Sequence, residues 1–196
     1  KTGTITENTM SLQSVYSFES DSLYEKEDWN NSDAKQVIEI AMWASEPVPF
    51  DPMEKTLHDE FKSTTANDVR SSFKIVHEYP LEGKPPMMTH VFQNENGQRI
   101  IAAKGGAETI LKVAKISDAE REKINQIIDR LASKGYRILG VAQSNYQEHD
   151  FPKDQQNIPF KLVGLVVFYD PPKSNIELVM NQFYKAGITI KVITGD

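Results

Sequence analysis

Lys104 and the two glycines that follow it, Gly105 and Gly106, are the residues most suggestive of a binding site. They come at the end of a predicted strand, and glycine lets the backbone approach a ligand closely. An isolated Lys-Gly-Gly is more often a solvated lysine beside an ordinary turn. The rest of the sequence therefore has to decide between a ligand site and a surface turn.

The composition excludes several other kinds of chemistry. Cysteine is absent, which rules out disulfides, thiolate metal sites and a cysteine nucleophile. The four histidines show no metal-ligand spacing, so we interpret His58, His77, His90 and His149 as ordinary surface or strand residues and expect no metal ligands. The 22 basic and 28 acidic residues give a net charge of −6, which disfavours a broad face for nucleic acid or anionic membrane. Any phosphate site must be local.

The apolar pattern predicts an α+β fold whose central antiparallel sheet is flanked by helices. Strands are expected at residues 9–18, with a possible bulge, and at 73–79, 87–92, 99–103, 136–142 and 162–168. One helix should begin near Ser32 or Asp33, a second at Asp51-Pro52, and a third after the capping-box pattern Ser117 to Glu120.

The two ends of the chain follow a different pattern. A helix is expected from 174 to about 186 and a strand from 188 to 193, which suits a parallel α/β sheet interrupted by the central region. The longest apolar run, Leu162 to Tyr169, is shorter than the roughly 20 residues of a membrane-spanning helix. We therefore expect a soluble, monomeric chain cut through structure at both ends.

Five segments, in order, resemble P-type cation-transporting ATPases. They are Lys1-Thr2-Gly3-Thr4, Asp51-Pro52-Met53-Glu54-Lys55, Lys104-Gly105-Gly106-Ala107-Glu108, Asp170-Pro171-Pro172-Lys173 and Thr194-Gly195-Asp196. Each segment is weak alone, and their order supplies the specificity. In that family an aspartate directly before Lys-Thr-Gly-Thr accepts the phosphoryl group of ATP. Because the chain begins after that position, the resemblance implies an ATP-binding domain without its catalytic residue.

The resemblance implies which residues bind ATP. Lys104 and Gly105 match the family's ATP-binding lysine motif, although Gly106 and Ala107 depart from it and imply a looser turn. Tyr79 matches the aromatic residue that stacks on adenine, and Glu54 matches the acidic residue near its amino group. For Tyr79 the alternative is a core tyrosine, and for Glu54 a helix-surface pair with a nearby lysine such as Lys55. The interpretation requires Tyr79 and Lys104 to face one cleft wide enough for a purine.

Phosphate contacts are implied at other positions. Arg137 matches an arginine that reaches the phosphates, with an exposed strand arginine as the alternative. The family's arginine two residues after the aromatic is Leu81 here, and Lys84 is expected to replace part of its role. Five terminal residues resemble those around the phosphorylated aspartate and its Mg²⁺, without forming a working site alone: Thr2, Lys173, Thr194, Gly195 and Asp196.

These matches imply a division of the chain and a set of partners. Residues 1–8 and 170–196 would flank a nucleotide-binding domain at 9–169, and would belong to the phosphorylation domain. The phosphorylation, actuator and transmembrane domains of a parent pump would be its partners, and the chain would face the cytoplasm. Similarity of Glu78-Tyr79-Pro80-Leu81 to bacterial calcium-pump-like members suggests calcium as the transported ion.

Two other classes of function stay open at this level. A haloacid-dehalogenase-like phosphatase would share the parallel sheet but would use the inserted region as a substrate cap. A protein-interaction module would be favoured if the Lys104 region were buried or blocked by its own side chains. An ATP-binding comparison separates the phosphatase from the pump domain, and a pull-down against membrane-domain fragments tests the interaction module.

Overall fold

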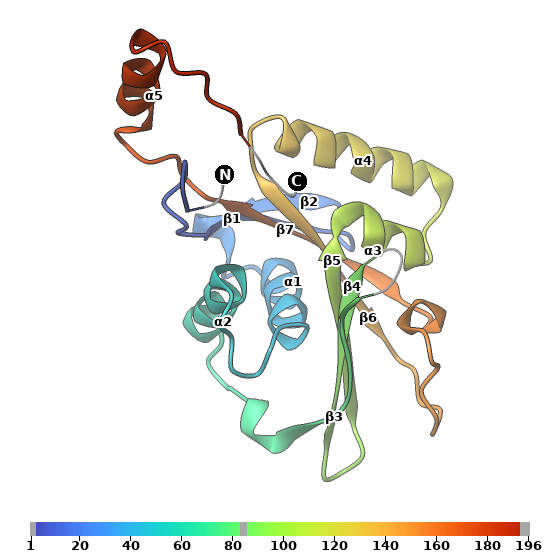
Figure 1. Cartoon of the computed structure of the whole chain (residues 1–196). Helices are drawn as coiled ribbons and strands as arrows, with labels where there is room; N and C mark the ends of the chain where they lie inside the picture. The colour runs from blue at the N-terminus through green and yellow to red at the C-terminus, as the bar shows by residue number, and fades with distance from the viewer. Residues whose placement is uncertain (1–2, 83–85, 193–196) are drawn as a thin grey trace.

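The chain folds around one seven-stranded antiparallel sheet with helices on both faces, which confirms the predicted α+β class (Figure 1). The computed structural model describes residues 3–82 and 86–192. The strands are β1 Ser11–Ser17, β2 Ser22–Glu25, β3 Phe73–Glu82, β4 Met87–Asn94, β5 Arg99–Gly106, β6 Arg137–Ser144 and β7 Lys161–Tyr169. Their order is β2-β1-β7-β6-β5-β4-β3, so the first and last strands of the sheet in sequence are neighbours.

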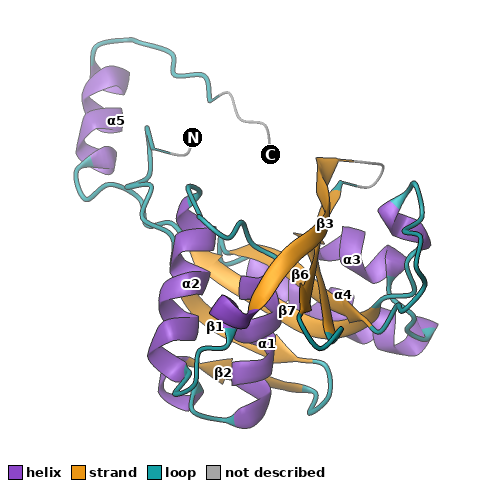
Figure 2. Cartoon of the chain, turned by 90° about the horizontal axis from the view of Figure 1, so that it is seen from below, coloured by secondary structure: helices purple, strands orange, loops and turns teal. Residues whose placement is uncertain are grey.

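Helices α1 (Ser32–Trp43) and α2 (Pro52–Thr64) cover one face of the sheet. Helices α3 (Ala107–Val113) and α4 (Asp118–Ala132) cover the other, as Figures 1 and 2 show. Because successive side chains of a strand point to opposite faces, each strand contributes to two separate cores. The face on which a side chain lies therefore decides which helices it contacts.

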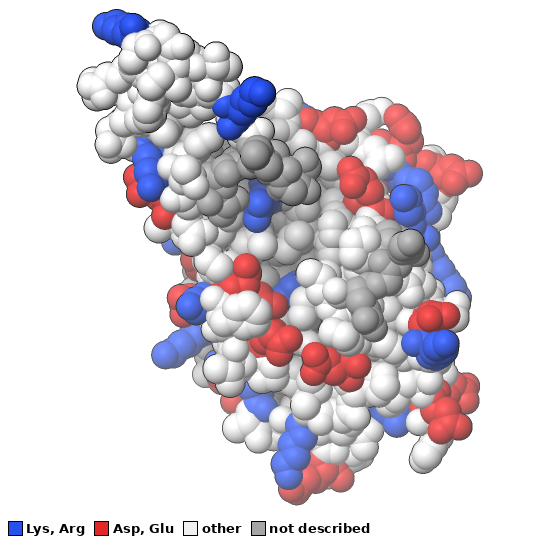
Figure 3. Space-filling model, viewed as in Figure 1, with Lys and Arg blue, Asp and Glu red and all other residues white. Residues whose placement is uncertain are grey.

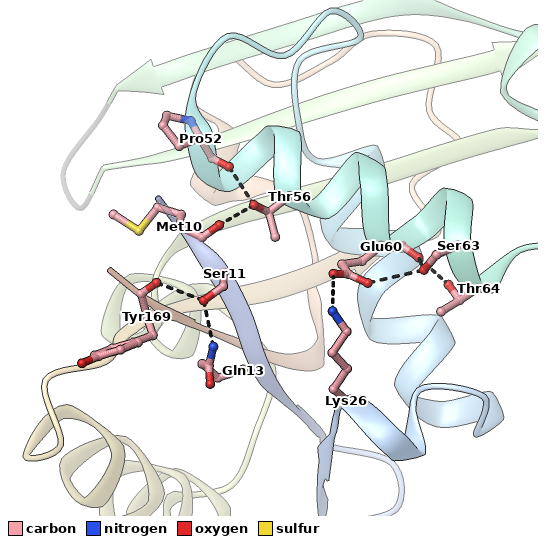
Figure 4. Close-up of polar contacts among 10 residues, drawn as sticks. All are labelled: Met10, Ser11, Gln13, Lys26, Pro52, Thr56, Glu60, Ser63, Thr64 and Tyr169. Atoms are coloured by element: carbon pink, nitrogen blue, oxygen red, sulfur yellow. Dashed lines mark hydrogen bonds and ion pairs between the residues drawn. The ribbon is translucent and has the colours of Figure 1, made fainter. Parts of the chain in front are cut away.

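The start of α2 is fixed by its cap and by contacts with β1. The Asp51 carboxylate accepts hydrogen bonds from the backbone N–H groups of Met53 and Glu54, which satisfies two donors of the first turn. One turn later, the Thr56 hydroxyl lies 2.7 Å from the Met10 carbonyl oxygen of the segment leading into β1 (Figure 4). These contacts hold Glu54 in the first turn of α2 facing the sheet.

Close packing between β1 and β7 depends on a glycine. A Cβ atom placed on Gly164 would lie 2.0 Å from the Tyr16 carbonyl oxygen, which is closer than any side chain tolerates. Gly164 pairs with Ser17 at the end of the β1–β7 ladder. The predicted bulge in β1 is present between Leu12 and Ser14. The bulge leaves Gln13 without a partner in the ladder to β7 and bends β1 locally.

The terminal segments are linked to each other beyond β1 and β7. The Glu7 N–H donates to the Pro171 carbonyl, and the Lys173 N–H donates to the Ile5 carbonyl, both at 2.9 Å. Helix α5 (Ile176–Lys185) follows and projects away from the sheet in both views (Figures 1 and 2). The strand expected at 188–193 is wrong over residues 188–192, because no strand in the described residues lies beside it to accept its hydrogen bonds; Ile193 is outside them.

Three local expectations need correction. The segment after β1 is not a plain loop but contains β2, which pairs with β1 at the sheet edge. Helix α3 follows β5 directly, where no helix was expected. The N-cap of α1 is Asn31 rather than Ser32 or Asp33, and its side chain accepts from the Asp33 N–H. The capping box of α4 at Ser117 and Glu120 is confirmed.

Candidate functional site

A cavity of about 560 Å³ opens between the start of α2 and the sheet strands β4, β5 and β6. This volume lies within the roughly 300–1,000 Å³ typical of small-molecule sites. Its polar residues are Glu46, Asp51, Glu54, Lys104, Gly105 and Gly106. Its apolar residues are Phe50, Met53, Leu57, Leu81, Pro86, Met88 and Leu139. A mainly apolar wall with a few convergent polar groups is the usual composition of a ligand pocket.

Lys104 and Glu54 form a buried ion pair in this cavity. The Lys104 Nζ lies 2.5 Å from Glu54 Oε1 and 2.7 Å from the Ser45 hydroxyl oxygen. Only 6% of each residue, Lys104 and Glu54, is exposed. The alternative stated for Glu54, a pair with Lys55 on the helix surface, does not fit this buried position. An interaction module would be favoured if the Lys104 region were buried or blocked by its own side chains. Lys104 is buried against Glu54 and Ser45, but it also lines an open cavity, so this condition is met only in part.

Each member of the pair keeps one hydrogen-bonding position. An ammonium group has three N–H donors, and Lys104 uses two of them on Ser45 and Glu54. Glu54 Oε2 is buried and has no hydrogen-bond partner in the part of the chain that the structure describes. Leaving a buried acceptor without a donor lowers stability by about 1–3 kcal/mol, and by more when the acceptor is charged. The cavity thus offers one donor and one unsatisfied acceptor side by side.

The inner end of the cavity is acidic. Burial lowers the pKa of Lys104, and its hydrogen bond to Glu54 and the charges of Glu54, Asp51 and Glu46 oppose that shift. Three carboxylates therefore surround one ammonium group. On the molecular face in Figure 3, acidic and basic side chains are interspersed, and among the described residues no broad basic area covers it. A strongly anionic group is better accommodated away from this inner end.

Gly105 and Gly106 form no loose turn. They complete β5, and Gly106 caps α3 in an extended conformation with φ −50° and ψ 141°, so the expectation of a looser turn is wrong. A Cβ atom on Gly105 would lie 3.1 Å from both the Met87 Cβ and the Pro86 carbonyl oxygen. The absent side chain therefore lets β4 and β5 approach closely at the cavity wall.

Tyr79 does not face the cavity, and this corrects the expectation that it shares a cleft with Lys104. Tyr79 pairs with Thr89, which pairs with Ala103, whereas Lys104 pairs with Met88. The side chains of Tyr79 and Lys104 consequently lie on opposite faces of the sheet. Tyr79 is 7% exposed in the core beneath α3 and α4, and its hydroxyl donates to the Pro152 carbonyl. It is a core tyrosine, the alternative stated for it.

Two exposed apolar residues occupy the position expected for an aromatic platform. Phe50 is 78% exposed and Leu81 is 66% exposed, and both line the cavity. Leu81 reaches it because the β3–β4 register shifts between Tyr79 and Glu82. Large apolar side chains exposed beside a pocket are candidate ligand contacts. Phe50 was missed because it lies outside every predicted element, although it directly precedes the Asp51 cap.

The remaining expected site residues that the structure describes, Arg137 and Lys173, are not part of the cavity wall. Arg137 starts β6 on the same face as Leu139 and Val141, and therefore on the face of Lys104. It pairs with Phe168, close to where the terminal segments leave the sheet. Lys173 lies in those segments and does not line the cavity. The expected contacts at Thr2, Lys84, Thr194, Gly195 and Asp196 lie outside the described residues.

Comparison with known proteins agrees with this architecture. Over residues 51–175 the chain matches the family described as P-type ATPase, cytoplasmic domain N. It is 26% identical over its full length to a putative cation-transporting ATPase of Methanocaldococcus jannaschii, covering 21% of that protein. A plasma membrane ATPase of Zygosaccharomyces rouxii is 25% identical over the full chain, which covers 20% of it. A sodium/potassium exporting P-type ATPase of Schizosaccharomyces pombe is 29% identical over 76% of the chain and 16% of its own length.

The chain spans about a fifth of the length of these relatives, so the match concerns one part of them. In the described residues, every helix is too short or too polar to cross a bilayer. The family match covers well over half of the chain and includes α2, the sheet strands β3 to β7 and all of the Lys104 cavity except Glu46 and Phe50. The chain belongs to the P-type ATPase family, in which it corresponds to cytoplasmic domain N.

Proposed function

We propose that this chain binds ATP in the Lys104 cavity and presents it to a phosphorylatable aspartate of a cation-transporting pump. The observation that carries the proposal is the unsatisfied Glu54 Oε2 beside the remaining N–H donor of Lys104, inside an apolar cavity. A ligand with an adjacent donor and acceptor on a flat ring would satisfy both groups at once. Adenine has this pattern in its amino group and ring nitrogens.

The base, rather than the phosphates, belongs at the inner end of the cavity. Glu46, Asp51 and Glu54 would repel a triphosphate there, whereas the neutral adenine amino group can donate to Glu54 Oε2. Phe50 and Leu81 then cover the faces of the ring, in place of Tyr79. Guanine carries a carbonyl oxygen where adenine has its amino group, so it would place an acceptor against a carboxylate. The site should therefore prefer ATP to GTP.

The phosphates then extend along the sheet toward Arg137 and the terminal segments. Arg137 is the first residue of β6 and lies on the cavity face, and a guanidinium group suits bidentate phosphate binding. Lys173 would meet the terminal phosphate from the segment after β7. Mg²⁺ would be held by the phosphates together with Thr2 and residues 194–196, which lie outside the described residues. Its chemistry there would be to neutralise phosphate charge during transfer.

The expected affinity is low. Stacking on an aromatic ring contributes about 0.5–1.5 kcal/mol. One or two charge-assisted hydrogen bonds contribute about 1.5–3 kcal/mol each, and association costs at least about 4 kcal/mol. With some apolar burial, a dissociation constant near 1 mM follows, on the order of −4 kcal/mol. The carboxylates that line the cavity lie at the end proposed for the base and not beside the phosphates, so we expect binding without hydrolysis.

The paired strands β1 and β7 support a division of the chain into domains. We propose that residues 9–169 form the nucleotide-binding domain and that 1–8 and 170–196 belong to the phosphorylation domain. The two connections run side by side, joined by hydrogen bonds between Glu7 and Pro171 and between Ile5 and Lys173. Bending there would swing ATP toward the aspartate. The actuator and transmembrane domains would complete the pump, with this part in the cytoplasm and calcium as the proposed ion.

Titration of the ¹⁵N-labelled chain with ATP, followed by proton–nitrogen correlation spectra, tests the proposal. ATP at 1–10 mM should shift the backbone signals of Glu54, Met88, Lys104 and Gly105, and GTP should shift them less at equal concentration. The signal of Thr89, on the opposite face of β4, provides an internal control that should move less than that of Met88. Unchanged cavity signals at 10 mM ATP would refute binding at this site.

A further inference from the structure

We propose a second ligand site: Glu46, Glu78 and His90 bind a divalent transition-metal cation of the zinc type. The candidate ligand atoms of these three residues all lie within 4.8 Å of one another. His90 lies on β4 directly opposite Glu78 on β3, and Glu46 lies in the loop after α1. Three parts of the chain that are distant in sequence therefore converge on one point.

The ring of His90 is the observation that distinguishes this cluster from ordinary surface carboxylates. His90 is fully buried, and its Nδ1 lies 3.0 Å from the Ser45 carbonyl oxygen. A carbonyl only accepts hydrogen bonds, so Nδ1 carries a proton, and a metal ion would bind the lone pair that Nε2 has in the neutral form of the ring. Nε2 is buried without a hydrogen-bond partner in the described part of the chain, and it lies 4.0 Å from Glu46 Oε1.

In the neutral form of the ring, His90 Nε2 and the carboxylate oxygens of Glu46 and Glu78 are all hydrogen-bond acceptors, and they face one another. A cation bound between them would satisfy all three, and the backbone hydrogen bond at Nδ1 is the outer-shell contact that usually orients a metal-binding histidine. Imidazole nitrogen with carboxylate oxygens suits zinc and its neighbours, whereas Mg²⁺ and Ca²⁺ prefer oxygen ligands alone. The ligand chemistry therefore selects zinc over the ion that accompanies ATP.

To bind zinc, the three ligand atoms must move somewhat closer together than the 4.8 Å within which they lie. Zinc holds nitrogen and oxygen ligands at about 2.0–2.2 Å, which places them roughly 3.3–3.5 Å apart in a tetrahedron. The Glu46 side chain is 32% exposed and Glu78 is exposed, so both carboxylates are able to move toward the fixed ring of His90. Three protein ligands leave the fourth position for water.

Ser45 and Glu46 connect this metal site to the nucleotide cavity. Its hydroxyl accepts from Lys104, and its carbonyl accepts from His90. Glu46 lines the cavity, whereas Glu78 and His90 do not. Substitution of Glu78 therefore tests the metal site without touching the cavity wall.

Calorimetric titration of the metal-free 196-residue chain with zinc chloride, in a non-chelating buffer without nucleotide, tests the proposal. We expect one zinc per chain, and at least a tenfold weaker affinity in Glu78→Gln and in His90→Gln. Glu95→Gln and His149→Gln are matched controls, because Glu95 is exposed on the next hairpin and His149 is 99% exposed beside Asp150. Both controls should bind zinc as the unaltered chain does.

Histidine ring spectra keep the test decisive if His90→Gln does not fold. Stoichiometric zinc should shift the ring signals of His90 and leave those of His149 in place, and excess Mg²⁺ should not reverse the shift. Undiminished zinc affinity in folded Glu78→Gln, or a shift confined to His149, would overturn the proposal. Because nucleotide is absent throughout, neither result depends on whether the chain binds ATP.

Discussion

The Lys104–Glu54 ion pair allows the most quantitative test of the structure. Both side chains are only 7% exposed, and the two charged atoms are 2.5 Å apart. Replacing Lys104 with methionine keeps a similar volume but leaves the Glu54 carboxylate without its cation. Removing one partner of a buried pair costs about 3–5 kcal/mol. Because the cavity admits water, we expect Lys104→Met to lower the free energy of unfolding by the lower figure, about 3 kcal/mol.

The double variant separates the pair from the packing around it. Replacing both partners with apolar residues of similar volume is often neutral or stabilising. Lys104→Met combined with Glu54→Met should therefore recover most of the lost stability and lie within about 1.5 kcal/mol of the unaltered chain. The coupling energy between the two positions would then be at least about 2 kcal/mol, well above the roughly 0.5 kcal/mol expected of independent sites.

Urea denaturation at pH 7, followed by tryptophan fluorescence, measures all four chains of this cycle. Lys74→Met is the matched control, because Lys74 is exposed on β3 and its loss should change stability by no more than about 0.5 kcal/mol. If Lys104→Met costs less than about 1 kcal/mol, or if the two substitutions add without coupling, the pair is not desolvated and the reasoning about the cavity fails.

Three further outcomes are expected. Gly164→Ala should lower the unfolding free energy by about 3 kcal/mol or more in urea denaturation, because its Cβ would strike the Tyr16 carbonyl oxygen; a loss below about 1 kcal/mol would contradict that clash. Phe50→Ala should weaken ATP binding about 2- to 10-fold by calorimetry, whereas Tyr79→Phe should leave ATP affinity unchanged and cost about 1 kcal/mol of stability; the reverse pattern would restore Tyr79 as the platform. The hydrogen bond from Arg70 lowers the pKa of Asp68 from 3.8 to about 2, so this exposed pair adds less than about 1 kcal/mol above pH 4 and loses it as pH falls to 2; Asp68→Asn should flatten stability over that interval, and an unchanged slope would count against the pair.

The sequence predicted helix starts well, because capping residues have a specific role at the first turn of a helix. Aspartate before proline predicted the start of α2, and the structure shows the Asp51 cap. The spacing of Ser117 and Glu120 predicted a capping box, which is also formed. Strand β2 was missed because its four residues form a sheet edge and carry little apolar alternation.

The face of a strand was harder to predict than the strand itself. Tyr79 and Lys104 lie on separate strands, and their relative orientation depends on the pairing register, which the sequence does not show. The register shift after Tyr79 brings Leu81 to the cavity, and no local sequence pattern predicts that shift. The prediction of a purine site at Lys104 therefore stays a prediction, now with Phe50 in the place proposed for Tyr79.

The terminal strand failed for a different reason. The apolar run from Ile188 suits a strand by composition, but a strand is stable only when a neighbour pairs with it. None of the described residues provides that neighbour. The family match likewise concerns domain N. The parallel sheet predicted from both ends was assigned to a phosphorylation domain, and that assignment stays a prediction.

The most direct test of the proposed ATP site is a measurement of proton–proton proximity between bound adenine and the methyl groups of the chain. Isotope-filtered nuclear Overhauser spectra of the ¹³C-labelled chain with excess ATP would provide it. The account predicts contacts from the adenine ring protons to Leu81, Met88 and Leu139, all of which line the Lys104 cavity. Contacts instead to Ile101 or Val91, in the core on the Tyr79 face, or none at saturating ATP, would contradict it.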